Sequence, residues 1–302
     1  MSGATSDDMG CCRVWFITGC SQGLGRALLE EVLASGERVV ATARNPQSLH
    51  SLAMRYPKLQ LLVLALDVTD RTQISDAFRS AKAHFGQVDV VVNNAGYGIQ
   101  SEIEATPESE ARRMMETLYW GAVHVTQEAV SIMRDVNHPH QGGLILNISS
   151  IGGYIGNATR GFYNSAKFAL EGFTEAFNKE MLPEWNIRAV IIQPGGFNTE
   201  WGGSSMAYNK PHALSVQFRQ MTKGKSVFNG DPCKAAQAIM QVADMREAPL
   251  RVQLGTDALM LVRSKALQTL EDTYRHEALA HSTNADGVDR EAVMAKLGAV
   301  RA

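Results

Sequence analysis

The chain of 302 residues is 45% hydrophobic and 20% charged, which is typical of a soluble globular protein with a full core, organised as one large domain or at most two. Its formal net charge is −2 and no block of like charges stands out, so nothing indicates a nucleic-acid partner. No apolar run approaches the roughly 20 residues of a membrane span, so we expect no transmembrane helix.

Short apolar runs rich in β-branched residues alternate along the chain with segments of helical spacing. Continuous apolar strands separated by helices predict a parallel sheet that is covered by helices on both faces. Because the alternation repeats without a break, we expect one doubly wound α/β domain with three layers. The expected strands are residues 13–18, 38–42, 59–66, 88–92, 143–149, 187–193 and 250–255. The expected helices are residues 23–36, 70–85, 107–133, 161–181 and 232–245, with one more that begins near Pro46 and one that follows Asp257.

The segment from Gly195 to Gly230 departs from this pattern, because it is rich in Gly, Ser, Asn and Lys and has only a weak helical signal at residues 216–221. A long irregular insert in a compact domain is usually a functional lid, a binding loop or a disordered segment. We therefore expect a single domain over residues 1–302, with a substrate-loop insert at 195–230 and a C-terminal helical extension at 257–302. The tail of this extension, residues 282–302, forms a short helix in one interpretation and is poorly ordered in the other.

The stretch TGCSQGLG, residues 18–25, lies where the first expected strand passes into the first expected helix. Gly19, Gly23 and Gly25 allow a sharp turn and a close approach of a ligand to the helix N-terminus, where free N–H groups and the helix dipole favour a pyrophosphate. The spacing is GxxxGxG rather than the common GxGxxG, and a tight turn without a ligand is the alternative. The position between strand and helix favours a dinucleotide site.

The second expected strand ends in ATARN, with Arg44 near its end and no acidic neighbour. An acidic side chain there accepts a hydrogen bond from the ribose 2′-OH of NAD, whereas an Arg suits the 2′-phosphate of NADP. Arg44 therefore indicates NADP(H), unless it is an ordinary surface residue.

Tyr163 and Lys167 lie four residues apart in GFYNSAKFALEG, so a helix places both on one face. This pair alone also occurs on many surface helices. The Tyr163–Lys167 pair becomes more specific because five motifs occur in order along the chain. They are TGCSQGLG, NNAG at residues 93–96, Ser150 thirteen residues before Tyr163, YNSAK, and PGGFNT at residues 194–199. Together they resemble the short-chain dehydrogenase/reductase family in its single-domain, non-extended form with a Rossmann fold, over residues 13–255. Residues 230–242 and 249–259 resemble the branch near 17β-hydroxysteroid dehydrogenases.

The resemblance implies a role for each catalytic residue. Tyr163 is expected to exchange a proton with the substrate oxygen, and since a tyrosine has a reference pKa of about 10 it needs help near neutral pH. Lys167 is expected to favour the phenolate and to hydrogen-bond the nicotinamide ribose. Ser150 is expected to donate to the substrate carbonyl oxygen, although a plain strand-end hydroxyl is the alternative, and Ser149 is the neighbour with which it can be confused. Ser165 is expected to be structural.

The resemblance also implies a set of cofactor contacts and no metal ion. Asp67 is expected to contact the adenine, or else to bond its own loop backbone. The NNAG motif, Asn93 included, is expected to line the cofactor, or else to form a plain turn. The full set of implied cofactor-binding residues is Thr18, Gly19, Ser21, Gln22, Gly23, Leu24, Gly25, Arg44, Asp67, Val68, Asn94, Ala95, Gly96, Tyr163, Lys167, Pro194, Gly195, Gly196, Phe197 and Thr199.

Leu118 departs from the family pattern, because the position three residues before Gly121 usually holds an Asn that binds a water in a proton relay. A Leu side chain cannot hydrogen-bond a water. Three interpretations remain: backbone groups hold that water, the enzyme is slower or adapted to an unusual substrate, or the site binds cofactor without reducing anything. Because Ser150, Tyr163 and Lys167 are all present, a working but altered reductase is favoured.

The leading hypothesis is NADPH-dependent reduction of a bulky hydrophobic ketone to a secondary alcohol, or the reverse oxidation. A non-catalytic NADP(H) sensor and a non-redox isomerase or cyclase are the alternatives. The insert carries side chains that suit an apolar lid, a packed core or a dimer face: Trp201, Met206, Tyr208, Phe218, Met221 and Phe228. The loops expected at the carboxyl ends of strands, where ligands bind in open α/β sheets, carry Tyr97, Gly98, Gly152, Tyr154 and Ile155.

The four cysteines, at positions 11, 12, 20 and 233, form no CxxC and no metal-ligand spacing. They fit a reducing compartment and argue against a disulfide framework. The first ten residues are polar and acidic, unlike a signal or transit peptide, so we expect a cytoplasmic protein. The family resemblance implies a homodimer or homotetramer, joined through the two long helices that carry Leu118 and Lys167.

Overall fold

The computed structural model describes residues 12–199, 206–208 and 230–301. The chain divides into two compact units, Met1–Leu261 and Val262–Ala302. The first unit contains the whole sheet. The second contains most of α9 (Thr256–Arg275), together with α10 (Glu277–His281) and α11 (Arg290–Arg301), and its described residues are almost all exposed. No described helix combines the length and the apolar character that crossing a membrane requires.

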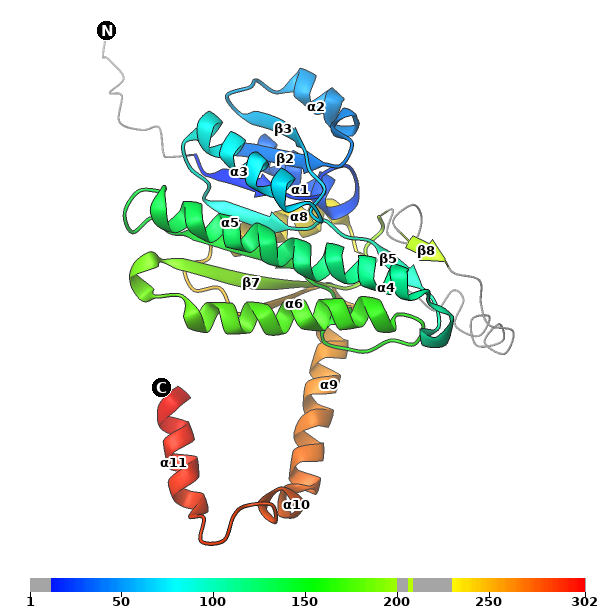
Figure 1. The fold of residues 1–302 in the computed structure, drawn as a ribbon, viewed down its shortest axis with the longest axis vertical. Helices are drawn as coiled ribbons and strands as arrows, with labels where there is room; N and C mark the ends of the chain where they lie inside the picture. Colours follow the sequence, from blue (N-terminus) through cyan, green and yellow to red (C-terminus); the bar gives the residue numbers. More distant parts are fainter. Residues whose placement is uncertain (1–11, 200–205, 209–229, 302) are drawn as a thin grey trace. The chain divides into compact units, whose positions relative to one another are not determined.

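Seven parallel strands form one sheet, as the alternating sequence pattern predicts, and their order in it is β3-β2-β1-β4-β6-β7-β9 (Figure 1). Each strand is a short apolar run, and the four residues of β1 are all buried. The strands are β1 (Val14–Ile17), β2 (Arg38–Ala43), β3 (Leu61–Ala65), β4 (Val90–Asn93), β6 (Gly143–Ile148), β7 (Ile187–Pro194) and β9 (Arg251–Leu254).

The strand order reverses at β1, which pairs with β2 on one side and with β4 on the other. Trp15, for example, lies opposite Val39 of β2 and opposite Val90 of β4. In open α/β sheets such a reversal opens a crevice at the carboxyl ends of the strands, where ligands bind. The fold therefore indicates a ligand site beside the residues that follow β1 and β4.

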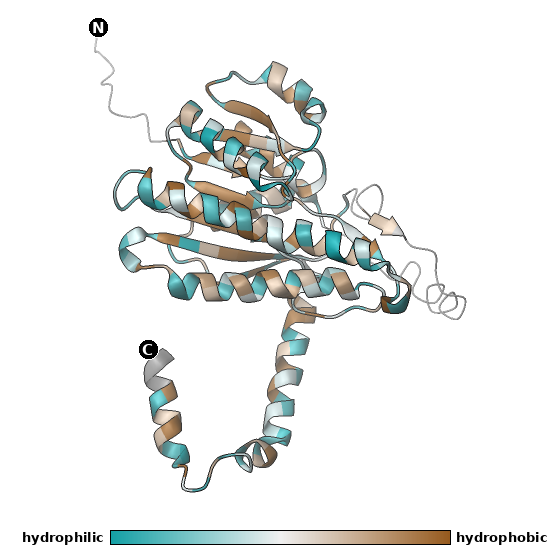
Figure 2. Cartoon of the chain, in the orientation of Figure 1, coloured by the Kyte–Doolittle hydropathy of each residue, from teal (hydrophilic) through white to brown (hydrophobic). Residues whose placement is uncertain are grey.

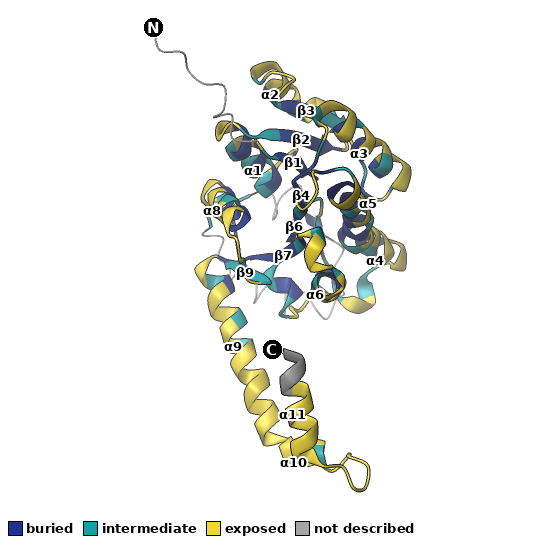
Figure 3. Cartoon of the chain, turned by 90° about the vertical axis from the view of Figure 1, so that its left-hand side faces the viewer, coloured by how far each residue is buried: buried dark blue, intermediate teal, exposed yellow. Residues whose placement is uncertain are grey.

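Helices cover both faces of the sheet, which gives three layers (Figure 3). On one face lie α1 (Gly23–Ala34), α2 (His50–Arg55) and α8 (Pro232–Asp244). On the other face lie α3 (Arg71–Phe85), α5 (Gly121–Asp135) and α6 (Gly161–Glu180), and α4 (Glu108–Met115) contacts α6. Shorter helical turns are η1 (Pro46–Leu49), η2 (Ile103–Ala105), η4 (Ile151–Gly153) and η5 (Pro183–Trp185).

Two apolar clusters form the core, one on each face of the sheet, because successive strand residues point to opposite sides. In β1, Trp15 and Ile17 pack against the α1–α8 side, while Phe16 packs against the α3–α5 side. Phe16 stacks on Phe78 of α3 with ring centroids 4.2 Å apart. The strands are accordingly the most hydrophobic segments of the chain, and the helices carry polar residues on their outer sides (Figure 2).

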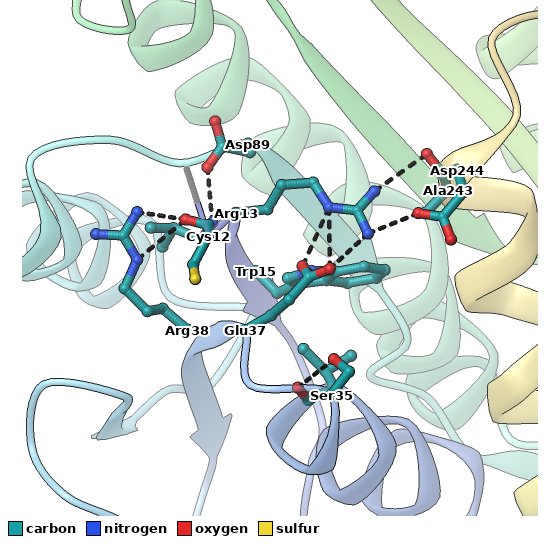
Figure 4. Close-up of polar contacts among 11 residues, drawn as sticks. Cys12, Arg13, Trp15, Ser35, Glu37, Arg38, Asp89, Ala243 and Asp244 are labelled. Carbon is teal, nitrogen blue, oxygen red and sulfur yellow. Dashed lines mark hydrogen bonds and ion pairs between the residues drawn. The ribbon is translucent and has the colours of Figure 1, made fainter. Parts of the chain in front are cut away.

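A polar cluster ties the amino-terminal ends of β1 and β2 to the end of α8 (Figure 4). The Arg13 guanidinium pairs with Glu37 at 2.6 Å and with Asp244 at 2.7 Å. The indole N–H of Trp15 donates to Glu37, and Asp89 accepts the backbone N–H of Val14 at 2.6 Å. This edge of the sheet is thus closed by protein contacts, whereas the carboxyl edge carries the cavity described below.

The structure differs from the predicted elements in two places. The predicted helix at 107–133 consists of α4 and α5 joined by a π-helical turn, η3 (Glu116–Trp120), which carries Leu118. A second, two-stranded parallel sheet pairs β5 (Gly98–Gln100) with β8 (Met206–Tyr208), and the sequence analysis assigned no strand to either segment. A π-helical turn such as η3 is common at functional sites. The weak helical signal at 216–221 lies outside the described residues.

Candidate active site

The glycine-rich turn after β1 brings the start of α1 close to the carboxyl ends of the strands. Gly19 and Gly23 have positive φ angles of 72° and 62°, which favour glycine. A Cβ atom at Gly25 would lie 2.2 Å from the Asn94 side-chain nitrogen and 2.5 Å from the Gly19 carbonyl oxygen. Gly25 therefore lets α1 pack against the turn, and the N-terminus of α1 faces the carboxyl edge of the sheet.

Thr18 and Asn94 hold the ends of β1 and β4 together at the reversal point. The Thr18 hydroxyl donates to the Val92 carbonyl oxygen at 3.1 Å and accepts from the backbone N–H groups of Asn94 and Ala95, at 2.9 and 3.0 Å. The Asn94 amide nitrogen in turn donates to the carbonyl oxygens of Thr18 and Gly19, at 2.9 and 3.0 Å. These bonds use the Thr18 hydroxyl within the protein, so Thr18 shapes the turn.

A cavity of about 830 Å³ runs along the carboxyl edge of the sheet. It brings together Ser150, Tyr163 and Lys167 with all the predicted cofactor-binding residues except Thr18, Gly25 and Asn93. Thr18 and Asn93 line a second, smaller cavity instead. Of the predicted substrate-side residues, Tyr97 and Met206 line the larger cavity, whereas Gly98, Gly152, Tyr154 and Ile155 do not. Trp201, Phe218, Met221 and Phe228 lie outside the described residues, as do most of the insert's other residues.

The three predicted catalytic residues meet in this cavity. Ser150 follows β6 and caps η4, where its hydroxyl accepts from the Gly152 N–H at 3.0 Å and hydrogen-bonds the Tyr163 phenol. Tyr163 and Lys167 are one turn apart on α6, and each is only 6% exposed. The Lys167 ammonium donates to the Ile148 carbonyl oxygen at 2.7 Å. One helix face and one strand end therefore present a hydroxyl, a phenol and an ammonium to the same space.

Burial favours the neutral forms of both Tyr163 and Lys167 and shifts their pKa values accordingly. It raises the pKa of Tyr163 to about 12, against the opposing effects of the Ser150 hydrogen bond and the Arg160 charge. Burial also lowers the pKa of Lys167 to about 8, against the opposing charge of Glu171. The Lys167 ammonium therefore carries its charge at neutral pH with little margin, and nearby charges decide how far it favours the phenolate.

Ser149, the neighbour of Ser150, belongs to a different set of contacts. Its hydroxyl donates to the buried carboxylate of Glu171 at 2.7 Å. The same carboxylate accepts from the Gln193 side chain at 2.8 Å and from Arg251 at 3.0 Å, so it joins α6 to β6, β7 and β9. Glu171 is 3% exposed, and the sequence analysis did not identify it. Ser165 lies on the exposed side of α6, where its hydroxyl donates to the Gly161 carbonyl oxygen at 2.9 Å.

Asp67 and Arg44 lie at the end of the cavity formed by β2 and β3. The Asp67 carboxylate accepts from the backbone N–H and the hydroxyl of Thr69, at 3.0 and 2.8 Å, so it bonds its own loop and lines the cavity as well. The Arg44 guanidinium is exposed and forms no ion pair with any described residue.

Leu118 is buried in the η3 turn, with 2% of its surface exposed. A Cβ atom at Gly96 would lie 2.7 Å from the Leu118 Cδ2 atom, so leucine fills the space beside the NNAG turn. Leu118, Asn93 and Lys167 line a second, small cavity of about 10 Å³. The Asn93 amide donates to Asn147 at 2.8 Å, and its Oδ1 atom has no partner among the described residues.

Several cavity residues escaped the sequence analysis. They include Arg113, Thr117, Ile151, Asn157, Arg160, Asp257 and Leu261. Arg113 comes from α4 and Asp257 from the start of α9, both far in sequence from the motifs. Arg160 is three residues before Tyr163, and a charged residue so near the predicted catalytic pair was the one sequence signal available. Within the described part of the chain, no cluster of His, Cys, Asp and Glu has the size of a metal site.

Comparison with known proteins identifies the family. The family model described as short chain dehydrogenase matches residues 13–209, so the chain belongs to the short-chain dehydrogenase/reductase family. An uncharacterized oxidoreductase of Schizosaccharomyces pombe is 38% identical over 281 residues, which cover 92% of this chain and 94% of the relative. An oxidoreductase of Penicillium decumbens is also 38% identical, covering 85% of this chain and 88% of the relative. The chain is accordingly an oxidoreductase of a family that uses nicotinamide cofactors.

Solved structures agree with the fold. A short-chain dehydrogenase from Streptomyces avermitilis is 32% identical and has a TM-score of 0.83, covering 91% of this chain and 100% of that protein. A short-chain dehydrogenase from Burkholderia cenocepacia is 22% identical, with a TM-score of 0.69 over 87% of this chain and 97% of that protein. The predicted fold class and family are thus confirmed, while the predicted branch near 17β-hydroxysteroid dehydrogenases stays a prediction.

Proposed function

We propose that the protein uses NADP(H) to interconvert a bulky hydrophobic ketone and its secondary alcohol. The observation that carries this proposal is the meeting of Ser150, Tyr163 and Lys167 in one cavity with the glycine-rich turn. Residues of these types in this arrangement suit proton transfer to a carbonyl oxygen. Apolar side chains of Ile151, Met206 and Leu261 line the same cavity and support a hydrophobic substrate.

The residues present fit a dinucleotide. The turn at Gly19 and Gly23 leaves no Cβ between the ligand and the N-terminus of α1, which suits a pyrophosphate. Arg44, unpaired among the described residues, would hold a ribose 2′-phosphate, and Asp67 would contact the adenine. Residues 194–199 would contact the nicotinamide amide. The Burkholderia structure is a complex with NADP, which supports this choice.

In the proposed reduction, NADPH held by these residues would supply the hydride that the carbonyl carbon accepts. Ser150 donates a hydrogen bond to the carbonyl oxygen and so stabilises the negative charge that develops there. Tyr163 donates its phenolic proton to that oxygen, which completes the alcohol. Lys167 stabilises the phenolate that remains, because its ammonium lies one helical turn away and is held by the Ile148 carbonyl. The reverse oxidation uses the same groups, with the phenolate as the base.

A cofactor-consumption assay tests the proposal. The protein is mixed with NADPH or NADH and a panel of bulky ketones, and the absorbance at 340 nm is followed while products are identified. We expect NADPH loss matched by alcohol formation. Product formation without NADPH loss would instead support an isomerase or cyclase. Tight NADPH binding without any turnover would support a sensor, for which the apolar Leu118 is the motivating observation.

We further propose a homo-oligomer in the cytoplasm. The η3 turn and the neighbouring helix α6 each carry an exposed apolar side chain, Trp120 at 43% and Phe168 at 41% exposure. Such side chains on two neighbouring helices suit an interface between copies. Light scattering of the purified protein measures the assembly, and a monomer at micromolar concentration would refute it.

A further inference from the structure

The charged residues of the large cavity fall into two groups. Arg44, Asp67 and Lys167 have roles in the function proposed above, and the Asp257 carboxylate accepts the Gly196 N–H at 2.7 Å. Two arginines remain, Arg113 and Arg160. Neither forms an ion pair with any residue that the structure describes, although the charge of Glu110, which does not line the cavity, helps to raise the pKa of Arg113. The two guanidinium groups therefore bring positive charge to this part of the cavity, where no described carboxylate pairs with them.

Arg160 lies close to the reacting phenol. It precedes the first residue of α6 and is three residues from Tyr163. The positive charge of Arg160 lowers the pKa of Tyr163, while burial raises that pKa by a larger amount. A ligand whose carbonyl oxygen reaches Tyr163 therefore lies within range of the Arg160 guanidinium.

Arg113 approaches the same region from α4. Tyr97 lies beside it, and the Tyr97 hydroxyl raises the pKa of the Arg113 guanidinium. That hydroxyl is buried and forms no hydrogen bond of good geometry with any described residue. Tyr97, Tyr163 and the Met114 neighbour of Arg113 pack in one apolar cluster, so these groups share one end of the cavity.

A backbone bond fixes this arrangement. The Ser101 N–H, just beyond β5, donates to the Thr159 carbonyl oxygen at 2.9 Å. The segment that starts at Tyr97 is thereby joined to the residue before Arg160. Thr159 has a positive φ of 65°, a conformation that a β-branched residue rarely adopts, so the turn that presents Arg160 is held by its surroundings.

We infer that Arg113, Arg160 and the Tyr97 hydroxyl form an anion-binding subsite, and that the substrate is a ketone that also carries a carboxylate or phosphate group. This inference rests on the proposed function and specifies that the ketone substrate is negatively charged. Guanidinium groups bind carboxylates and phosphates through paired, charge-assisted hydrogen bonds, and a phenol supplies a third donor. The apolar walls hold the carbon skeleton, while this end recognises the anion.

The adjacent residue Arg112 provides a matched control. Its guanidinium is exposed, pairs with Glu108 at 2.6 Å and does not line the cavity. Arg112→Gln and Arg113→Gln therefore remove the same charge one residue apart on the same helix. Only the second change removes it from the cavity.

The experiment compares 4-acetylbenzoate, 4-acetylphenyl phosphate and the neutral methyl ester of 4-acetylbenzoate as substrates with NADPH. For the unaltered protein we expect a higher kcat/KM for at least one anionic ketone than for the ester. In Arg113→Gln and Arg160→Gln that preference should fall roughly 10- to 100-fold, mainly through KM, since each loses a charge-assisted hydrogen bond. Arg112→Gln should keep it, and Arg160→Lys should restore part of it. The carboxylate and phosphate arms show which anion is preferred.

A binding measurement separates this inference from the proposed function. Calorimetry of the NADPH-loaded protein with benzoate, phenyl phosphate and neutral benzamide should show anion binding that is lost in Arg113→Gln and Arg160→Gln. Turnover of the ester without preference for either anion, and no anion binding, would overturn the subsite and leave the reductase intact. Anion binding that depends on both arginines, without turnover of any ketone, would support the subsite and count against the reductase.

Discussion

The Lys167 ammonium donates a hydrogen bond of 2.7 Å to the backbone carbonyl oxygen of Ile148, the last residue of β6. This bond holds a buried charge at the carboxyl edge of the sheet, one turn of α6 from Tyr163. The Glu171 carboxylate, one turn further along α6, raises the pKa of Lys167 against the larger lowering by burial. The position and the charge of the ammonium are therefore set by the strand end and the helix together.

Replacing Lys167 with Met should stabilise the cofactor-free protein at pH 7. The ammonium is charged in the folded and unfolded states below pH 8, and its burial, which lowers its pKa to about 8, then opposes folding. A shift of this size corresponds to about 3 kcal/mol, from which we subtract about 1 kcal/mol for the lost Ile148 bond. Between pH 8 and the pKa of Lys167 in the unfolded chain, the unfolded state binds more protons than the folded state, so the stability of the unaltered protein rises with pH. The difference in stability between Lys167→Met and the unaltered protein should therefore shrink. Urea denaturation at pH 7 and pH 10 measures both, and a difference that grows with pH would contradict this reasoning.

Replacing Tyr163 with Phe should abolish turnover and leave NADPH affinity nearly unchanged. The change removes the proton donor while keeping the ring in its apolar cluster. We expect kcat to fall by roughly a factor of 100 to 10,000, the usual contribution of a general acid. Steady-state kinetics and NADPH fluorescence titration measure the two quantities, and unchanged turnover would refute the role of Tyr163.

Replacing Arg44 with Ser should reduce the preference for NADPH over NADH. Arg44 lines the cavity at the end of β2 and is unpaired among the described residues, so its charge is available to a 2′-phosphate. Losing a charge-assisted contact should lower the ratio of the two kcat/KM values roughly 10- to 100-fold. Arg79→Ser, in which the lost charge pairs with Asp76 away from the cavity, is the control and should keep the ratio. An unaltered ratio in Arg44→Ser would remove the basis for NADP(H).

Gly25→Ala and Gly172→Ala should change stability in opposite directions. A Cβ atom at Gly25 meets Asn94 and the Gly19 carbonyl at 2.2 and 2.5 Å, so we expect a loss of about 1 to 3 kcal/mol and weaker NADPH binding. A Cβ atom at Gly172, inside α6, meets nothing within 4 Å, so alanine there should add about 0.5 to 1 kcal/mol. Urea denaturation compares the two variants, and equal effects would show that the close approach at Gly25 is unimportant.

Leu118→Asn should lower stability and raise kcat. The change buries an amide in place of an apolar side chain that is 2% exposed, which we expect to cost about 1 to 3 kcal/mol. The same amide reaches the small cavity lined by Lys167 and Asn93, where it can hold a water for proton transfer. Turnover and its solvent isotope effect test this, and Leu118→Met serves as the apolar control. A kcat no higher than that of Leu118→Met would mean that proton delivery does not limit the reaction.

The strands were predictable from the sequence because each is a continuous apolar run, and such runs are buried on both faces of a parallel sheet. Predicted and observed bounds differ by at most two residues, as for the third strand, predicted at 59–66 and observed at Leu61–Ala65. The β5–β8 pairing was not predictable, because three-residue strands have no periodicity of their own and Gly98 and Met206 are far apart in sequence. The same holds for η3, since a π-turn changes hydrogen bonding without changing the apolar spacing.

The sequence by itself determined the family and the doubly wound fold, and it predicted the residues of the candidate site, because all of these depend on local motifs in a fixed order. Only the tertiary structure decided what surrounds them. Arg113 lines the cavity because α4 packs against α6, and Glu171 is buried because Ser149, Gln193 and Arg251 converge on it from three strands. Burial and charge at a site are sums over neighbours that are distant in the chain, so no local pattern encodes them.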